Sequence, residues 1–182
     1  MLDQLINGLY YGILLPVMDG FKIFVWSNTF YYTFPVLFLL SIPVVIIRYY
    51  QITNKKSLNF QLIEVFVWLF RLLQYALIIF LGNNLLIKHL FSKQIWNIVF
   101  QRLTHVDAQE LIRNIIGFCI IFGICNLILY LVINKNWSAR LIQKMFDHTN
   151  VDLFYPAITL GIKNLFLIPV SVIYLFAILN II

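Results

Sequence analysis

The run LFLIPVSVIYLFAILNII, from Leu165 to Ile182, decides the class of this protein. It contains no charged residue and one proline near its start. A helix needs roughly 20 mainly apolar residues to cross the hydrocarbon core of a bilayer. This run reaches that length when the apolar residues before it are included, and Pro156 suits a first helical turn. We therefore expect a transmembrane helix over residues 156–182.

The composition of the whole chain agrees with a membrane protein. Of its 182 residues, 62% are hydrophobic and only 11% are charged. Soluble domains are about half apolar and about a quarter charged, so this chain has too few charges to cover a water-facing surface. Its length leaves room for about four or at most five spans and for no catalytic domain outside the membrane.

Three further segments have the length and apolarity of spans, namely residues 33–47, 61–81 and 114–134. The second ends at Gly82-Asn83-Asn84, a strong helix stop. Arg113 and Lys135 flank the third as end markers. The first is short and is followed by Arg48, a residue type that settles at membrane interfaces, so we expect tilt or local bilayer thinning to make up its length.

Three other segments are expected to form short interfacial helices. Residues 2–26 are apolar but broken, and we expect their helix to end between Pro16 and Gly20. Residues 93–106 and 137–147 have apolar residues at helical spacing and basic or amide residues elsewhere around the helix. The predicted fold is a single domain over residues 1–182: an all-α integral membrane protein with four transmembrane helices and short interfacial amphipathic helices.

A polar stripe runs along the span at 61–81. Gln61, Glu64, Arg71 and Gln74 fall on one side of this helix at 100° per residue. Glu64 and Arg71 are about 10 Å apart along it, so they are not expected to pair directly. The stripe is either polar glue between helices or the lining of a hydrophilic path, and Asn126 could be its cross-helix partner in both cases.

The charged residues do not predict nucleic-acid binding or catalysis. The chain has 13 Lys and Arg against 7 Asp and Glu, but it contains no block of five like charges, so the excess suits an anionic lipid surface. No His-Glu-x-x-His motif, nucleophile elbow or phosphate loop is present. We expect no catalytic, cofactor or metal site, and we expect Cys119 and Cys125 to be unbridged, inert packing residues.

Four short motifs follow one another in order along the chain. They are Leu15-Pro16-Val17-Met18-Asp19-Gly20, then Phe34-Pro35 with Pro43, then Phe100-Gln101-Arg102 with Asp107-Ala108, and last Ile168-Pro169-Val170-Ser171. This order resembles the Tic-twenty family, the four-span component of the protein-import translocon of the chloroplast inner envelope, with algal plastid and cyanobacterial relatives. In the third motif, Phe100, Arg102 and Ala108 match the family, whereas Leu103, Thr104 and Asp107 depart from it, as in a divergent member.

The resemblance implies a role in protein import across a plastid inner envelope, or across a cyanobacterial or other organellar inner membrane. The chain would line or brace a protein-conducting path, and its partners would be the bilayer, other membrane subunits of the translocon and unfolded precursor proteins. The first residues, Met1-Leu2-Asp3-Gln4, resemble no transit peptide, which suits either a gene carried by the plastid or a mature form of the chain. The alternatives are an accessory subunit of a respiratory or photosynthetic complex and, third, a small-solute transporter.

Overall fold

The computed structural model describes residues 8, 10–53, 60–86, 88, 92–133 and 151–182, and the regular structure in these ranges is helical. The elements, in chain order, are η1 (Tyr10–Leu14), α2 (Leu15–Thr33), α3 (Pro35–Thr53), α4 (Phe60–Gly82), α5 (Lys93–Arg102), η3 (Leu103–His105), α6 (Ala108–Val132), α8 (Val151–Ile162), η4 (Lys163–Leu167) and α9 (Ile168–Ile178). Two of them, η1 and η4, are π-helical turns, and η3 is a 3₁₀ turn.

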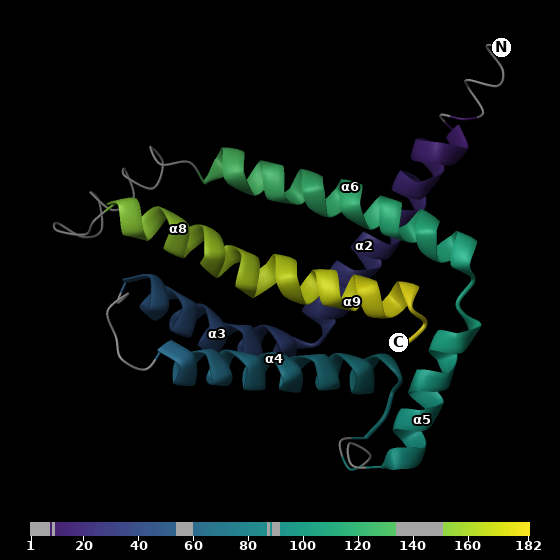
Figure 1. The fold of residues 1–182 in the computed structure, drawn as a ribbon, viewed down its shortest axis with the longest axis horizontal. Helices are drawn as coiled ribbons and strands as arrows, with labels where there is room; N and C mark the ends of the chain where they lie inside the picture. The colour runs from purple at the N-terminus through teal and green to yellow at the C-terminus, as the bar shows by residue number, and fades with distance from the viewer. Residues whose placement is uncertain (1–7, 9, 54–59, 87, 89–91, 134–150) are drawn as a thin grey trace.

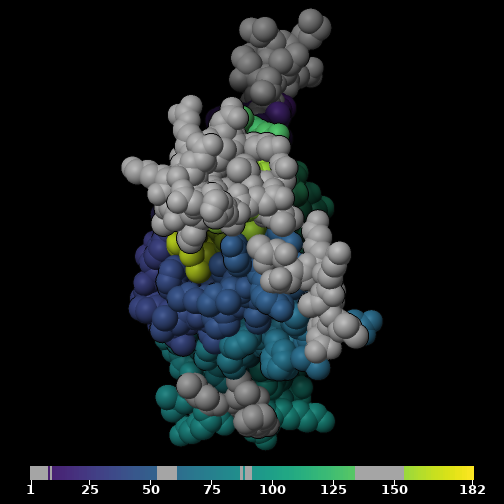
Figure 2. Space-filling model, turned by 90° about the vertical axis from the view of Figure 1, so that its left-hand side faces the viewer, coloured from purple at the N-terminus to yellow at the C-terminus, as the bar shows by residue number. Residues whose placement is uncertain are grey.

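The long helices run side by side, and α2 crosses them (Figure 1). α8, η4 and α9 form one continuous rod through the middle of the bundle. α3 packs against α4 and α8, whereas α2 packs mainly against α6 and α9. Figure 2, which looks at the end where α3 ends and α4 begins, shows these two helices next to each other. α5 lies across the opposite end, between the end of α4 and the start of α6.

Four helices are long and apolar enough to cross a membrane: Pro35–Ile52, Gln61–Gly82, Ala108–Val132 and Phe154–Ile178. The predicted all-α fold class and the predicted number of candidate spans are therefore confirmed. The second span agrees closely with the prediction, because the stop signal at Gly82 is local. Helix α4 ends there, and Asn84 adopts a positive φ of 53°.

The predicted ends of the other spans need correction. α3 continues to Thr53 rather than stopping at residue 47, and Arg48, inside this helix, pairs with Glu64 on α4. α6 begins at Ala108 rather than at residue 114, since Asp107 caps it and Arg113 lies inside it. The last helix ends at Ile178, ahead of Asn180, which has a positive φ of 54°.

The prediction that the first helix ends between Pro16 and Gly20 is wrong. Helix α2 begins at Leu15 and continues to Thr33, and Pro16 lies near its start, directly after the π turn η1. Gly20 does not break the helix but lets it approach α6. A Cβ on Gly20 would lie 2.9 Å from the Cα of Gly117, and a Cβ on Gly117 would lie 2.3 Å from the carbonyl oxygen of Pro16. The crossing of α2 and α6 therefore requires both glycines.

The predicted amphipathic helix at 93–106 is present as α5 followed by η3. Its apolar face packs on the end of the bundle, where Val99 is buried with Ile79 and Ile181. Asn83, just after α4, fastens this end: it accepts a hydrogen bond from Arg102 and donates one to the carbonyl oxygen of Ile181. The interfacial helix predicted at 137–147 lies outside the described residues.

The main core is aromatic and joins α2, α6 and α9. Phe118, Phe122 and Tyr174 form close ring contacts, and Phe24 meets Phe122 edge to face. Tyr174 is fully buried, and its hydroxyl donates to the carbonyl oxygen of Asn114 at 3.1 Å. Cys119 and Cys125 are both free thiols, and Cys119 is exposed on the outside of α6 rather than packed in this core.

Candidate functional site

Pro169 creates the backbone feature around which the polar side chains gather. An α-helix would direct the N–H of residue 169 to the carbonyl of Leu165, but proline has no N–H. One residue earlier, the N–H of Ile168 bonds to Lys163 in the π-helical pattern and not to Asn164. The carbonyl oxygens of Asn164 and Leu165 thus lose their usual donors, and such groups need other partners inside a membrane.

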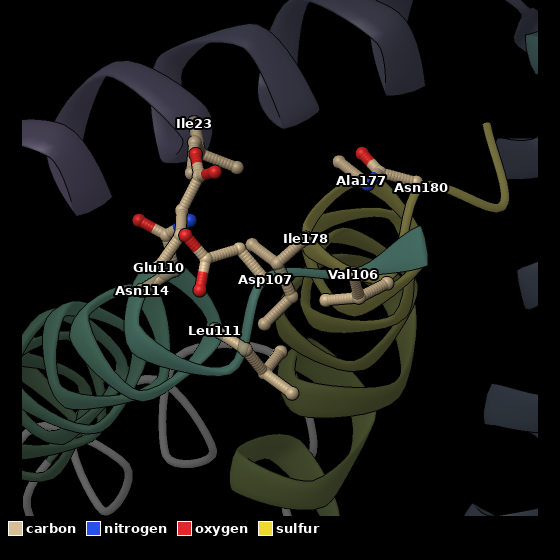
Figure 3. A pocket seen from close by; sticks show the side chains of 9 residues that line it. All are labelled: Ile23, Val106, Asp107, Glu110, Leu111, Asn114, Ala177, Ile178 and Asn180. Atoms are coloured by element: carbon tan, nitrogen blue, oxygen red, sulfur yellow. The ribbon is translucent and has the colours of Figure 1, made fainter. Parts of the chain in front are cut away.

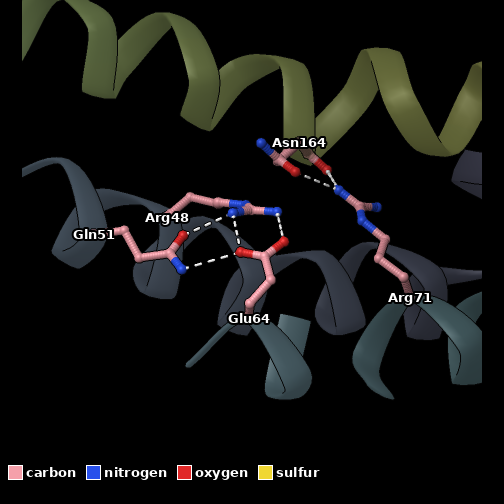
Figure 4. A network of polar contacts seen from close by, with 5 residues as sticks. All are labelled: Arg48, Gln51, Glu64, Arg71 and Asn164. Carbon is pink, nitrogen blue, oxygen red and sulfur yellow. Dashed lines mark hydrogen bonds and ion pairs between the residues drawn. The ribbon is translucent and has the colours of Figure 1, made fainter. Parts of the chain in front are cut away.

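Arg71 on α4 and Tyr31 on α2 supply these donors. The Arg71 guanidinium donates to the backbone oxygen of Asn164 at 3.1 Å and to its side-chain oxygen at 2.7 Å (Figure 4). The Tyr31 hydroxyl donates to the carbonyl oxygen of Leu165 at 2.6 Å. The π turn is therefore the point where α2 and α4 are fixed to the central rod.

Arg71 is a buried charge that is solvated by neutral oxygens. Arg71 is 5% exposed, and the third acceptor of its guanidinium is the side-chain oxygen of Gln74 at 2.7 Å. Among the described residues, no carboxylate lies within ion-pair distance of it. Because removing an ion from water is costly, the three oxygens around this guanidinium are essential for keeping it at this depth.

Gln74 extends the network to α3. Its amide nitrogen donates to the carbonyl oxygen of Leu37 and to the hydroxyl of Ser41, both at 2.8 Å. Ser41 in turn lies 3.3 Å from the hydroxyl of Tyr31. Gln74, Ser41 and Tyr31 are all fully buried. One connected set of hydrogen bonds thus links α2, α3, α4 and η4.

A second polar cluster ties the end of α3 to the start of α4. The Arg48 guanidinium binds the Glu64 carboxylate with two parallel hydrogen bonds of 2.6 and 2.7 Å (Figure 4). Gln51 accepts from Arg48 at 2.8 Å and donates to Glu64 at 3.2 Å. This bidentate geometry is the strong form of an arginine–carboxylate pair, and the two side chains are 26% and 31% exposed.

The residues predicted to form one polar stripe have different surroundings in the structure. Glu64, Arg71 and Gln74 point to neighbouring helices, and Glu64 and Arg71 do not pair with each other. Gln61 is exposed at the start of α4. Asn126 does not reach α4: its amide donates to the carbonyl oxygen of Phe122 one turn earlier in the same helix, at 2.7 Å.

The motif positions of the family resemblance lie where helices meet or begin. Pro16 and Gly20 contact α6 at Gly117, and Asp19 forms an ion pair with Arg113 at 3.4 Å.

The later motif positions lie at the ends of helices. Arg102 bonds to Asn83, which follows α4. Asp107 accepts the N–H of Gln109 and caps α6, whose first residue is Ala108. Pro169 is buried at the start of α9.

Sequence reasoning missed several members of the network. Arg48 is predicted only to settle at the membrane interface, and no role is predicted for Gln51 or Ser41. Asn164 had a usable signal, because an amide five residues before a proline in an apolar helix marks a place where carbonyls lose their donors. Tyr31 had no such signal, since buried and interfacial tyrosines look alike in a sequence.

The polar side chains of the network join neighbouring helices. The described residues include no group of three or more His, Cys, Asp or Glu side chains placed to hold a metal ion. Each polar side chain of the network bonds across a helix boundary, so the network can fix the relative positions of the spans. Comparison of the chain with protein-family models, with curated proteins and with solved structures finds no match.

Proposed function

We propose that this chain is a membrane component of a protein-import translocon, in which it braces the protein-conducting path together with partner subunits. The family resemblance supplies the biological role. The placement of the motif positions supports the proposal: segments far apart in the sequence, at Gly20, Asp107 and Pro169, all occupy joints between helices.

The buried polar network is the observation that favours bracing over lining. A side chain that lines a path must have polar atoms available to a passing chain, because the backbone groups of that chain need hydrogen-bond partners in hydrocarbon. Arg71 and Gln74 are almost completely buried, and their hydrogen-bonding groups are directed at α3 and η4. We infer that these residues hold the helices in place and that the path lies along the outside of the bundle, against neighbouring subunits.

The outer faces of α4 and α6 provide the contact surface that such neighbours need. Leu62, Val65, Leu69 and Leu72 on α4 are each more than half exposed. On α6, Leu127, Tyr130 and Leu131 are equally exposed. These apolar faces would also suit an accessory subunit of a respiratory or photosynthetic complex, so the nature of the neighbours decides between the two functions.

Purification of the chain in a mild detergent, followed by identification of the proteins that copurify, tests this proposal. We expect membrane subunits of an import translocon and, when import is arrested, a precursor protein. Copurification with cofactor-bearing subunits of an electron-transfer complex would overturn the proposal and establish the accessory role. A variant with Arg71→Leu is a useful second sample, because loosened bracing should weaken the association with partners.

A further inference from the structure

A small polar pocket lies between the start of α6, the end of α9 and the side of α2 (Figure 3). Its volume is about 130 Å³, and its polar lining comes from Asp107, Glu110, Asn114 and Asn180. The pocket belongs neither to the buried network around Arg71 nor to the cluster around Glu64. Because α6 begins here and α9 ends here, it lies at one end of two candidate spans.

Asn114 is the side chain that indicates a binding site in this pocket. The residue is only 6% exposed, and its backbone oxygen accepts from Tyr174. Among the described residues its side-chain amide makes no hydrogen bond, although it lines the pocket (Figure 3). The amide atoms of Asn114 are not among the fully buried, unpartnered side-chain atoms of the described residues, so they are accessible from the pocket, where an entering group can hydrogen-bond to them.

The pocket is rich in hydrogen-bond acceptors. The Asp107 carboxylate uses one oxygen to cap α6, at 2.9 Å from the N–H of Gln109, and its other oxygen makes no hydrogen bond among the described residues. Glu110 is largely exposed, with Arg113 4.0 Å away. Ionised carboxylates accept hydrogen bonds but do not donate them, and they repel anions. The complementary group therefore carries several N–H or O–H donors and no net negative charge.

A second hollow on the outside of the bundle, of about 380 Å³, borders this pocket. It shares Ile23 and Ala177 with the pocket, and its other lining residues are Lys22, Trp26 and Ile182. A polar pocket at the end of the spans beside a mainly apolar groove matches a lipid, with its headgroup at the interface and its acyl chain in the hydrocarbon. Trp and Lys side chains favour the interface.

We propose that the pocket binds the headgroup of a membrane lipid that carries hydrogen-bond donors, either an ammonium group or sugar hydroxyls, and that the acyl chain lies in the groove beside Trp26. The proposal depends on the chain lying in a bilayer but not on the translocon role. A lipid seated here would join α2, α6 and α9 at one end of the bundle, and would thus fasten the crossing helix to the spans.

The test is competition between lipids for the purified full-length chain. The protein in detergent is offered equal amounts of an ethanolamine phospholipid, a monohexosyl diacylglycerol and a choline phospholipid with the same acyl chains, and the bound lipids are measured by native mass spectrometry. Choline has neither N–H nor O–H groups. One hydrogen bond typically changes an equilibrium constant by about fivefold, so we expect at least one of the first two lipids to be enriched about fivefold over the choline lipid.

Variants distinguish lipid binding in the pocket from lipid binding elsewhere on the surface. Asn114→Leu should reduce the enrichment to the level of the choline lipid, whereas Asn126→Leu, on the same helix but outside the pocket, should leave it unchanged. Glu110→Gln, at an exposed position, should weaken binding of the ammonium lipid and spare the sugar lipid, which identifies the headgroup. Equal retention of all three lipids by the unmodified chain, or enrichment that survives Asn114→Leu in a monodisperse sample, would overturn the proposal.

Discussion

Arg71 on α4 donates two hydrogen bonds from one guanidinium nitrogen to Asn164 in the π turn, at 2.7 Å to the side-chain oxygen and 3.1 Å to the backbone oxygen. This contact joins two spans that are far apart in the sequence. It exists because Pro169 removes a backbone donor, and because the π turn directs the N–H of Ile168 to Lys163. The missing N–H of Pro169 thus leads to a fixed contact between α4 and the central rod.

Replacing Asn164 with leucine should destabilise the bundle by about 2 kcal/mol, because a buried charge loses its best acceptor and hydrogen bonds to charged groups contribute about this much. The matched control is Asn126→Leu, whose amide bonds only within its own helix and whose loss should cost about 0.5 kcal/mol or less. Both are measured as free energies of unfolding in mixed detergent. Equal effects of the two substitutions would contradict the bridging role of Asn164.

Tyr31 and Pro169 should be energetically coupled. Tyr31→Phe alone leaves the carbonyl oxygen of Leu165 without its donor and should cost about 1 kcal/mol. In a chain that already carries Pro169→Ala, the restored N–H can bond to Leu165, so the same substitution should cost much less. A double-mutant cycle measures the difference. Strictly additive effects would show that the tyrosine does not compensate for the proline.

Arg48 and Glu64 should show a favourable coupling of about 1 kcal/mol in a double-mutant cycle built from Arg48→Met and Glu64→Gln. The geometry is bidentate, but the partial exposure of both side chains limits the gain. Arg48→Lys should not restore the stability, because an ammonium group cannot form two parallel bonds with a carboxylate. Full rescue by lysine would indicate that only the charge matters.

The crossing of α2 and α6 should not tolerate a side chain at Gly117. A Cβ there would lie 2.3 Å from the carbonyl oxygen of Pro16, so the backbone must move, and overpacking of this kind costs about 1–3 kcal/mol. Gly123 on the same helix has open space around it, and Gly123→Ala should be neutral or slightly stabilising. Thermal unfolding of the two variants gives the comparison, and similar midpoints would contradict the close approach.

The sequence was most informative where a signal is local. The end of α4 at Gly82 and the apolar face of α5 depend on neighbouring residues only, and both are predicted well. The end of the first helix is predicted wrongly at Pro16, because a proline can end one helix or begin the next. The pairing of Arg48 with Glu64 and the bond from Arg71 to Asn164 depend on how the spans are arranged. Hydrophobic periodicity carries no information about that arrangement, and it does not register a single π turn.

Photo-crosslinking during arrested import tests the bracing account most directly. A photoreactive residue is placed at Leu69, on the exposed face of α4, or at Gln74, which is fully buried, and the crosslinked proteins are identified. We expect crosslinks from position 69 to the precursor or to a translocon subunit, and only internal crosslinks from position 74. A precursor crosslinked from position 74 would show that the polar side chains line the path, and would contradict the claim that they brace it.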